Sequence, residues 1–156
     1  MDMPFKRKRV LITGGAGFIG SNLVRRLVEE GAIVKILDNF FTGQKENLYG
    51  LNVEIIQGDV ENIDDVNKAV EGAEIVFHLA ARNIIVSTRE PYKDFLTNVL
   101  GTFNILQACL EKKSQIEKIV YASSVSIYGN AKYLPINEDD SKTILNPYAA
   151  SKLAAE

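Results

Sequence analysis

Tyr148 and Lys152 stand four residues apart in a stretch whose pattern predicts a helix. Residues with this spacing lie on the same face of a helix. A tyrosine has a pKa of ~10 and is a poor base at neutral pH, but a neighbouring ammonium group stabilises the tyrosinate and lowers that pKa. The pair can therefore remove a proton from an alcohol. Ordinary surface pairs show the same spacing, so its meaning depends on the residues that accompany it.

A serine-rich segment, residues 121–129, supplies a third polar group. It overlaps and follows an apolar run, residues 119–122, that predicts a buried strand, so Ser124 is expected just beyond the carboxyl end of that strand. Ligands of open α/β sheets bind at this edge. Ser124 can hydrogen-bond a reacting hydroxyl or carbonyl there, although a loop serine also commonly bonds its own backbone.

A glycine-rich bend follows the first apolar run, Val10–Ile12. Its glycines are Gly14, Gly15, Gly17 and Gly20. They fit a dinucleotide-binding loop in two registers, beginning at either Gly14 or Gly15, because residues without Cβ let a pyrophosphate approach closely. The helix predicted from Phe18 points free amides at that anion, including those of Phe18 and Ile19. No Lys-Ser or Lys-Thr follows the glycines, which excludes a P-loop.

Two acidic residues end the next two predicted strands. Asp38 lies 18 residues after Gly20, where a carboxylate can accept hydrogen bonds from the adenine ribose and would repel the 2′-phosphate of NADP. No arginine follows closely, so the pattern favours NAD as the cofactor. Asp59, after Gly58, fits a place beside the adenine equally as well as a turn or helix cap.

Strand-like and helix-like patterns alternate along the chain and indicate what must position these residues. The predicted strands are 10–12, 33–37, 53–56, 75–79 and 119–122, and the predicted helices are 18–30, 63–70, 92–112 and one from Pro147. Such alternation predicts one domain over residues 1–156, a Rossmann-type, doubly wound parallel sheet in a three-layer α/β/α fold. The helix over 92–112 carries an apolar stripe through Phe95, Val99, Phe103 and Leu106. We expect that stripe in the core, with a dimer contact as the alternative.

Composition excludes several other classes. A net charge of −2 leaves no broad basic surface for nucleic acid, and one histidine and one cysteine rule out a histidine-cluster metal site and an internal disulfide. No apolar run reaches the roughly 20 residues that cross a membrane, and no signal-peptide core is present, so we expect a cytoplasmic protein. The last predicted helix has no stop signal before Glu156, which suggests a fold truncated before a substrate domain.

Taken together, these segments resemble the NAD-dependent epimerase/dehydratase group of the extended short-chain dehydrogenase/reductase family. The matching segments, in family order, are Thr13–Gly20, Asp38-Asn39, Gly58-Asp59-Val60, His78-Leu79-Ala80-Ala81, Asn98-Val99, Ser123–Gly129 and Asn146–Lys152. The resemblance implies that Ser124, Tyr148 and Lys152 are catalytic. It further implies that cofactor contacts come from Gly14, Gly17, Phe18, Ile19, Gly20, Asp38, Asn39, Asp59, Val60, Leu79, Ala80, Ala81, Asn98, Tyr148 and Lys152.

The same resemblance implies a nucleotide-sugar epimerase, with UDP-linked sugars as the expected substrates, hydride transfer to NAD and a homodimer. His78 is expected to be packed and hydrogen-bonded, with no metal. Val125 and Ser126 stand where related dehydratases carry an Asp-Glu pair, which argues against 4,6-dehydration. A decarboxylase, a reductase and a non-catalytic NAD-binding fragment or regulator remain alternatives, and the fragment alone is expected to be inactive.

Overall fold

The structure, a computed structural model, describes residues 4–112 and 115–156. Five parallel strands form its sheet: β1 (Arg9–Thr13), β2 (Ile33–Asp38), β3 (Glu54–Gln57), β4 (Ile75–His78) and β5 (Lys118–Tyr121). Their order is β3-β2-β1-β4-β5. β2 and β3 extend the sheet to one side of β1, and β4 and β5 extend it to the other side. This order matches the first five strands of the Rossmann order 3-2-1-4-5-6, and such sheets bind ligands at the carboxyl edge beside the switch between β1 and β4. The predicted parallel sheet and fold class are confirmed.

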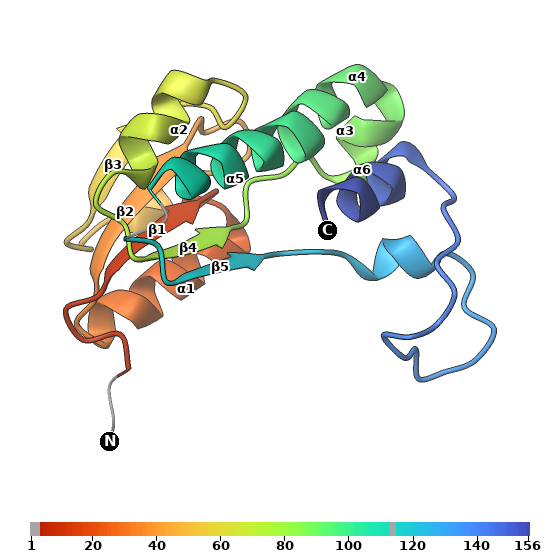
Figure 1. Cartoon of the computed structure of the whole chain (residues 1–156), viewed down its shortest axis with the longest axis horizontal. Coiled ribbons are helices and arrows are strands. Elements are labelled where there is room, and N and C mark those ends of the chain that lie inside the picture. Colours follow the sequence, from red (N-terminus) through yellow and green to blue (C-terminus); the bar gives the residue numbers. More distant parts are fainter. Residues whose placement is uncertain (1–3, 113–114) are drawn as a thin grey trace.

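Helices cover both faces of the sheet, as predicted (Figure 1). α1 (Phe18–Glu29) lies on one face, and α2 (Ile63–Val70) and α5 (Gly101–Glu111) lie on the other. An apolar cluster fills the space between the sheet and the helices on each face. Val24 and Leu27 of α1 pack in one cluster, and Val66 of α2 and Ile105 of α5 pack in the other. β1 is buried from Val10 onward and serves both clusters, because alternate side chains of a strand point to opposite faces.

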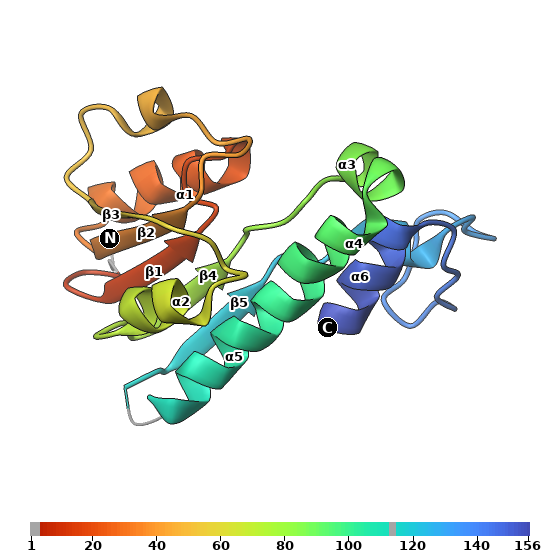
Figure 2. The same cartoon turned by 90° about the horizontal axis from the view of Figure 1, so that it is seen from above.

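The predicted long helix over 92–112 is one continuous rod with a π-helical segment inside it (Figure 2). It consists of α4 (Pro91–Asp94), the π-helical η2 (Phe95–Leu100) and α5. The expectation that its apolar stripe lies in the core is wrong, because Phe95, Phe103 and Leu106 are 51%, 59% and 46% exposed. Apart from Ile105, small and polar residues occupy the buried face instead: Thr97, Asn98, Gly101, Thr102, Asn104, Ala108 and Cys109.

A second group of helices gathers beyond the carboxyl ends of β4 and β5 (Figures 1 and 2). α6 (Pro147–Ala155) contacts α3 (Ile84–Arg89), α4 and η2 there. Asn146 caps α6 by accepting a hydrogen bond from the Ala149 amide at 2.8 Å, and Pro147 takes the first helical position, both as predicted.

Helix α3 was not predicted, because its Ile-Ile-Val run has the β-branched residues typical of strands. The Asn83 side chain begins the helix by accepting hydrogen bonds from the amides of Ile85 and Val86. Two short 3₁₀ segments complete the fold, η1 (Lys45–Leu48) and η3 (Val125–Tyr128). Within the described residues, no helix is long and apolar enough to cross a bilayer.

Candidate dinucleotide and catalytic site

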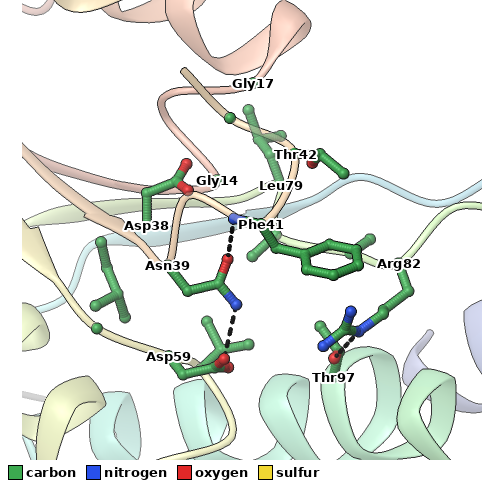
Figure 3. A pocket seen from close by; sticks show the side chains of 16 residues that line it. Gly14, Gly17, Asp38, Asn39, Phe41, Thr42, Asp59, Leu79, Arg82 and Thr97 are labelled. Atoms are coloured by element: carbon green, nitrogen blue, oxygen red, sulfur yellow. Dashed lines mark hydrogen bonds between the residues drawn. The ribbon is translucent and has the colours of Figure 1, made fainter. Parts of the chain in front are cut away.

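A cavity of about 110 Å³ lies at the carboxyl ends of β1, β2 and β4 (Figure 3). Nine predicted cofactor contacts line it: Gly14, Gly17, Asp38, Asn39, Asp59, Val60, Leu79, Ala80 and Ala81. Its other lining residues are Leu37, Phe41, Thr42, Gly43, Gly58, Arg82 and Thr97. Most of the predicted contacts therefore meet around one hollow, although they come from four separate segments of the chain.

The glycine bend leaves no room for side chains at two positions. Gly14 has a φ of +69°, and a Cβ there would lie 2.8 Å from the backbone nitrogen of Ala80. A Cβ on Gly20 would lie 2.2 Å from the carbonyl oxygen of Gly14. Gly15 instead faces Ile36 of β2. Gly14 and Gly17 line the cavity and Gly15 does not, which favours the register that begins at Gly14.

The amino end of α1 is left without a partner from its own side chains. Gly17 caps the helix without a side-chain hydrogen bond, and its first turn contains no acidic residue. First-turn amides have no acceptor within a helix and carry the positive end of its dipole. Phe18 and Ile19 are 85% and 68% exposed and do not line the cavity, so only their backbone amides suit the predicted contact with phosphate.

The two predicted acidic residues and Asn39 form one hydrogen-bonded edge of the cavity. Asp38 is buried and ties the loop together, because its carboxylate accepts from the amides of Ala16 and Phe40, both at 2.8 Å. Asn39 donates to Asp59 at 2.7 Å (Figure 3). Asp59 also accepts from the Glu61 amide, so it caps a turn and lines the cavity at once.

Arg82 and Phe41 meet across the cavity and had no signal in the sequence. The Arg82 guanidinium carbon lies 4.1 Å from the centre of the Phe41 ring, in cation–π contact (Figure 3). Arg82 Nε donates to Thr97 at 3.0 Å, which fixes the guanidinium on the helical side. The two loops that carry Arg82 and Phe41 are far apart in the chain, so only the fold brings them together.

His78 is packed and hydrogen-bonded, as predicted. It is 2% exposed, its Nδ1 lies 2.7 Å from the Thr13 hydroxyl, and its Nε2 lies 2.9 Å from the Thr102 hydroxyl. Burial, followed by the positive charge of Lys152, lowers the pKa of His78 to about 3. The ring is therefore neutral at physiological pH. Among the described residues, no group of three His, Cys, Asp or Glu side chains is arranged to hold a metal.

The His78 environment predicts a pH dependence. Because its folded pKa lies below the ordinary 6.5, the unfolded chain takes up the proton first. The contribution to stability is complete above ~6.5 and falls as the pH drops toward about 3, by about 1.4 kcal/mol per pH unit. As the chain has one histidine, its ring proton resonances should keep neutral-form shifts down to ~pH 5 in NMR titration. A midpoint near 6.5 in the folded protein would contradict this.

Ser124, Tyr148 and Lys152 lie on two elements in contact with each other, η3 and α6. Ser124 begins η3, and its hydroxyl accepts from the Ser126 amide at 3.2 Å. Tyr148 is half-buried in the first turn of α6. Lys152 is 3% exposed, and its Nζ lies 4.3 Å from the centre of the Tyr121 ring. Burial lowers the pKa of Lys152 to about 8, against the opposing charges of Asp94 and Glu156.

Asn98 connects the cavity with α6. Its Oδ1 accepts from the Arg82 amide at 2.7 Å, and its Nδ2 donates to Ser151 at 3.1 Å. Arg82 lines the cavity, whereas Ser151 lies next to Lys152. Asn98, Ser124, Tyr148 and Lys152 are themselves outside the cavity lining, and Ser124 lines a separate hollow with Ser123, Tyr128 and Glu138. The structure thus places the two predicted groups on one sheet edge, joined by a short hydrogen-bonded path.

The parallel sheet switches its strand order between β1 and β4, beside a glycine bend, and a carboxylate ends its second strand. These features define a dinucleotide-binding α/β protein. The model of the family described as "NAD dependent epimerase/dehydratase family" matches residues 10–156. The chain belongs to this family.

Relatives of the chain are named as sugar-nucleotide enzymes. A putative UDP-glucose 4-epimerase of Methanocaldococcus jannaschii is 42% identical over 150 residues, covering 94% of this chain and 48% of the relative. A UDP-N-acetyl-alpha-D-glucosaminuronate decarboxylase of Bacillus cytotoxicus is 41% identical over 140 residues, covering 87% and 42%. The chain thus spans about half the length of the curated relatives it matches.

Solved structures of similar proteins share the fold. The UDP-glucose 4-epimerase of Thermus thermophilus, in complex with NAD, superposes with a TM-score of 0.87 at 39% identity, over 94% of this chain and 48% of that one. An epimerase of Methanothermobacter thermautotrophicus gives a TM-score of 0.91 at 35% identity, over 98% and 46%. The identities and the superpositions together show a common fold, and the Thermus thermophilus structure contains NAD.

Proposed function

We propose that this chain is the NAD-binding, catalytic half of a nucleotide-sugar epimerase that acts on UDP-linked sugars at C4. One observation carries the proposal: the glycine bend with Asp38 and the elements bearing Ser124, Tyr148 and Lys152 lie along the same edge of one sheet. A ligand must be long enough to contact both the glycine bend and the elements bearing the three catalytic candidates, and a dinucleotide has two separated ends that can do so. The UDP-glucose 4-epimerases among the relatives support this substrate class.

We assign the adenine end of NAD, with the pyrophosphate, to the cavity. Gly14 and Gly20 let the bend pack tightly against its own backbone, and the bend leads into the amino end of α1, which has no side-chain cap and suits a pyrophosphate. Asp38 offers carboxylate oxygens for the adenine ribose hydroxyls, and Asp59 lies in the same cavity lining, where it fits a place beside the adenine. The negative charge of Asp38 supports NAD over NADP.

Replacing Asp38 by alanine tests this assignment. We expect about a 10- to 100-fold loss in NAD⁺ affinity by calorimetry, because a hydrogen bond to a charged group contributes about 1.5–3 kcal/mol. Asp64→Ala is the matched control, since Asp64 is exposed on α2 outside the cavity. If Asp38→Ala and Asp64→Ala bind NAD⁺ alike, the ribose assignment fails.

The proposed chemistry gives Ser124, Tyr148 and Lys152 separate tasks. NAD, when bound, supplies hydride acceptance and return. Tyr148, as tyrosinate, removes the proton from the sugar hydroxyl, and Ser124 holds that oxygen by a hydrogen bond. Lys152 supplies a positive charge beside Tyr148 and hydrogen-bonds the nicotinamide ribose. Incubating the complete enzyme with UDP-galactose and detecting UDP-glucose by NMR tests the activity; no conversion would contradict it.

A decarboxylase is the second candidate, because one relative of comparable identity carries that name. The two reactions share hydride removal and differ in the later fate of the keto-sugar, so residues of the present chain serve both. The same NMR assay separates them when a UDP-glucuronic acid substrate is added. Release of carbon dioxide would favour the decarboxylase, whereas inversion at C4 without loss of carbon favours the epimerase.

The exposed apolar side of the long helix suits a homodimer. Tyr92, Phe95, Phe103, Leu106 and Leu110 are all between 46% and 73% exposed along α4, η2 and α5. Solvated apolar patches of this kind mark contacts between proteins. Sedimentation of Phe103→Glu should show monomers where the parent sediments as a dimer, with Leu134→Glu, exposed elsewhere, as control. A monomeric parent would contradict the dimer.

The proposed partners are otherwise small molecules. The net charge of −2 supports neither nucleic-acid nor membrane-surface binding, because both require a basic patch. A single cysteine, Cys109 on the buried face of α5, fits a reducing compartment, and we propose a cytoplasmic location. Fractionation of cells producing the tagged protein tests this location; recovery with the membrane pellet would contradict it.

A further inference from the structure

Asp94 is a buried carboxylate for which the proposed chemistry has no use. It ends α4 and is 1% exposed. Its Oδ1 accepts hydrogen bonds from the Ser87 hydroxyl and from Asn98 Nδ2, the latter at 2.6 Å. Both donors are neutral. A carboxylate removed from water with only neutral partners is unfavourable unless a cation lies nearby.

Among the described residues Lys152 is the one buried lysine or arginine, and it lies on α6, which packs against α4. Lys152 is 3% exposed, and no carboxylate of the described residues lies within ion-pair distance of its Nζ. Its Nζ instead lies over the Tyr121 ring. Asp94 and Lys152 are therefore two buried opposite charges on contacting helices, α4 and α6. Each lowers the cost of burying the other.

A hydrogen-bonded bridge joins Asp94 to the catalytic turn. Asn98 Nδ2 donates to Asp94 and also to the Ser151 hydroxyl at 3.1 Å. Ser151 in turn donates to the carbonyl oxygen of Tyr148 at 3.0 Å. The bridge thus runs from Asp94 to the residue before Lys152 and to the backbone of Tyr148.

We propose that Asp94 is a positioning residue for the Tyr148–Lys152 pair: it anchors Asn98 against the first turn of α6, and its negative charge keeps the Lys152 ammonium protonated. The inference rests on the proposed function for its catalytic meaning. The structural part, a coupling between Asp94 and Lys152, stands without any substrate.

None of the other charged or titratable groups around Lys152 provides a buried negative charge that would keep its ammonium protonated. Tyr121 and His78 face it from the strands, and both are neutral at physiological pH, since burial raises the pKa of Tyr121 and lowers that of His78. Tyr148 is the proposed base. Glu156 also favours the charged lysine, but it is exposed and engaged with Ser123 and Lys142. Arg89 of α3 and Lys93 of α4 are exposed cations.

The charge of Asp94 affects the pH range in which Lys152 carries its proton. Burial brings the pKa of Lys152 down to about 8, and Asp94 opposes that fall. Without the negative charge of Asp94 the pKa of Lys152 would fall further, and a smaller share of the lysine would carry the positive charge that stabilises a tyrosinate. Sequence gives no hint of this, because Asp94 is one of 20 acidic residues and lies 58 positions from Lys152.

Asp94→Asn separates charge from hydrogen bonding. The amide oxygen still accepts from Ser87 and Asn98, but the negative charge is gone. We expect the titration midpoint of Lys152, followed by ¹³C NMR of its ε-carbon and assigned with Lys152→Arg, to fall by about one pH unit or more. Ser151→Ala, which breaks the bridge and keeps the charge, and Asp64→Asn, an equal charge change at an exposed site, should leave the midpoint unchanged.

An unchanged Lys152 midpoint in Asp94→Asn would overturn the inference. Should that variant not fold, Lys152→Met and the double variant Asp94→Asn/Lys152→Met keep the test decisive. Removing only the lysine leaves a buried, unpaired carboxylate, so the double variant should melt at a higher temperature than Lys152→Met. Equal or lower melting would overturn the coupling. Neither measurement uses NAD⁺ or sugar, so failure here is distinct from failure of the proposed epimerase.

Discussion

Gly14→Ala should reduce NAD⁺ affinity by about 100-fold or more, equivalent to about 2.7 kcal/mol. The new methyl group would lie 2.8 Å from the Ala80 nitrogen, and the residue would keep a φ of +69°. Backbone on both sides prevents a simple side-chain adjustment, so the glycine bend must shift away from β4. The α1 amino end would then no longer face the pyrophosphate position. Calorimetric titration with NAD⁺ measures the loss.

Gly72→Ala is the matched control for that experiment. Gly72 has a φ of +75°, nearly that of Gly14, but nothing lies within 4 Å of the position that a Cβ would take there. Both variants therefore carry the same backbone strain, about 1 kcal/mol, and only one of them meets an obstacle. Gly72→Ala should bind NAD⁺ as the parent does. Equal affinity in Gly14→Ala and Gly72→Ala would show that the bend does not hold the cofactor.

In the complete enzyme, Tyr148→Phe should lower turnover by about 10²- to 10⁴-fold, the range for loss of a general base. The ring and its packing remain, and only the hydroxyl that takes the proton is lost. NAD⁺ affinity should change by less than about tenfold, because one neutral hydrogen bond contributes about 1 kcal/mol. Steady-state rates with UDP-galactose, together with calorimetry, distinguish a catalytic defect from a binding defect.

Tyr133→Phe makes the same chemical change at a tyrosine that is 78% exposed, and it should retain full turnover. A Tyr148→Phe enzyme that also retains full turnover would remove Tyr148 as the base. If Tyr148→Phe instead lost NAD⁺ binding and turnover together, the tyrosine would be supporting the cofactor site, and the division of tasks between Tyr148 and Lys152 would need revision.

Local patterns were sufficient to predict the strands of the sheet and most of the glycine and acidic residues that line the cavity. Short apolar runs followed by Gly14–Gly20 or by Asp38 identify strand ends, because turns and free polar groups have characteristic residues there. The alternation of strands with helices predicts that the strands are parallel, since parallel crossovers are right-handed and contain a helix. These features depend on residues close together in the chain, so a single sequence contains them. The order β3-β2-β1-β4-β5 comes from the structure.

Features that depend on tertiary packing were not predictable in the same way. The apolar stripe of the long helix is exposed, while Thr97, Asn98 and Thr102 are buried, because those polar groups find partners on β4, α6 and the loop after β4. Periodicity alone cannot distinguish a stripe that meets a second protein from one that meets the core. The same holds for Arg82, whose guanidinium is placed by Phe41 and Thr97.

A crystal structure of the protein with NAD⁺ is the most direct test of a shared cofactor for both groups of residues. We expect the pyrophosphate against the Gly14–Gly20 bend, the adenine ribose on Asp38, and the nicotinamide ribose within hydrogen-bond reach of Lys152, with Tyr148 beside the ring. A dinucleotide bound elsewhere, or one whose nicotinamide end points away from α6, would contradict a shared cofactor.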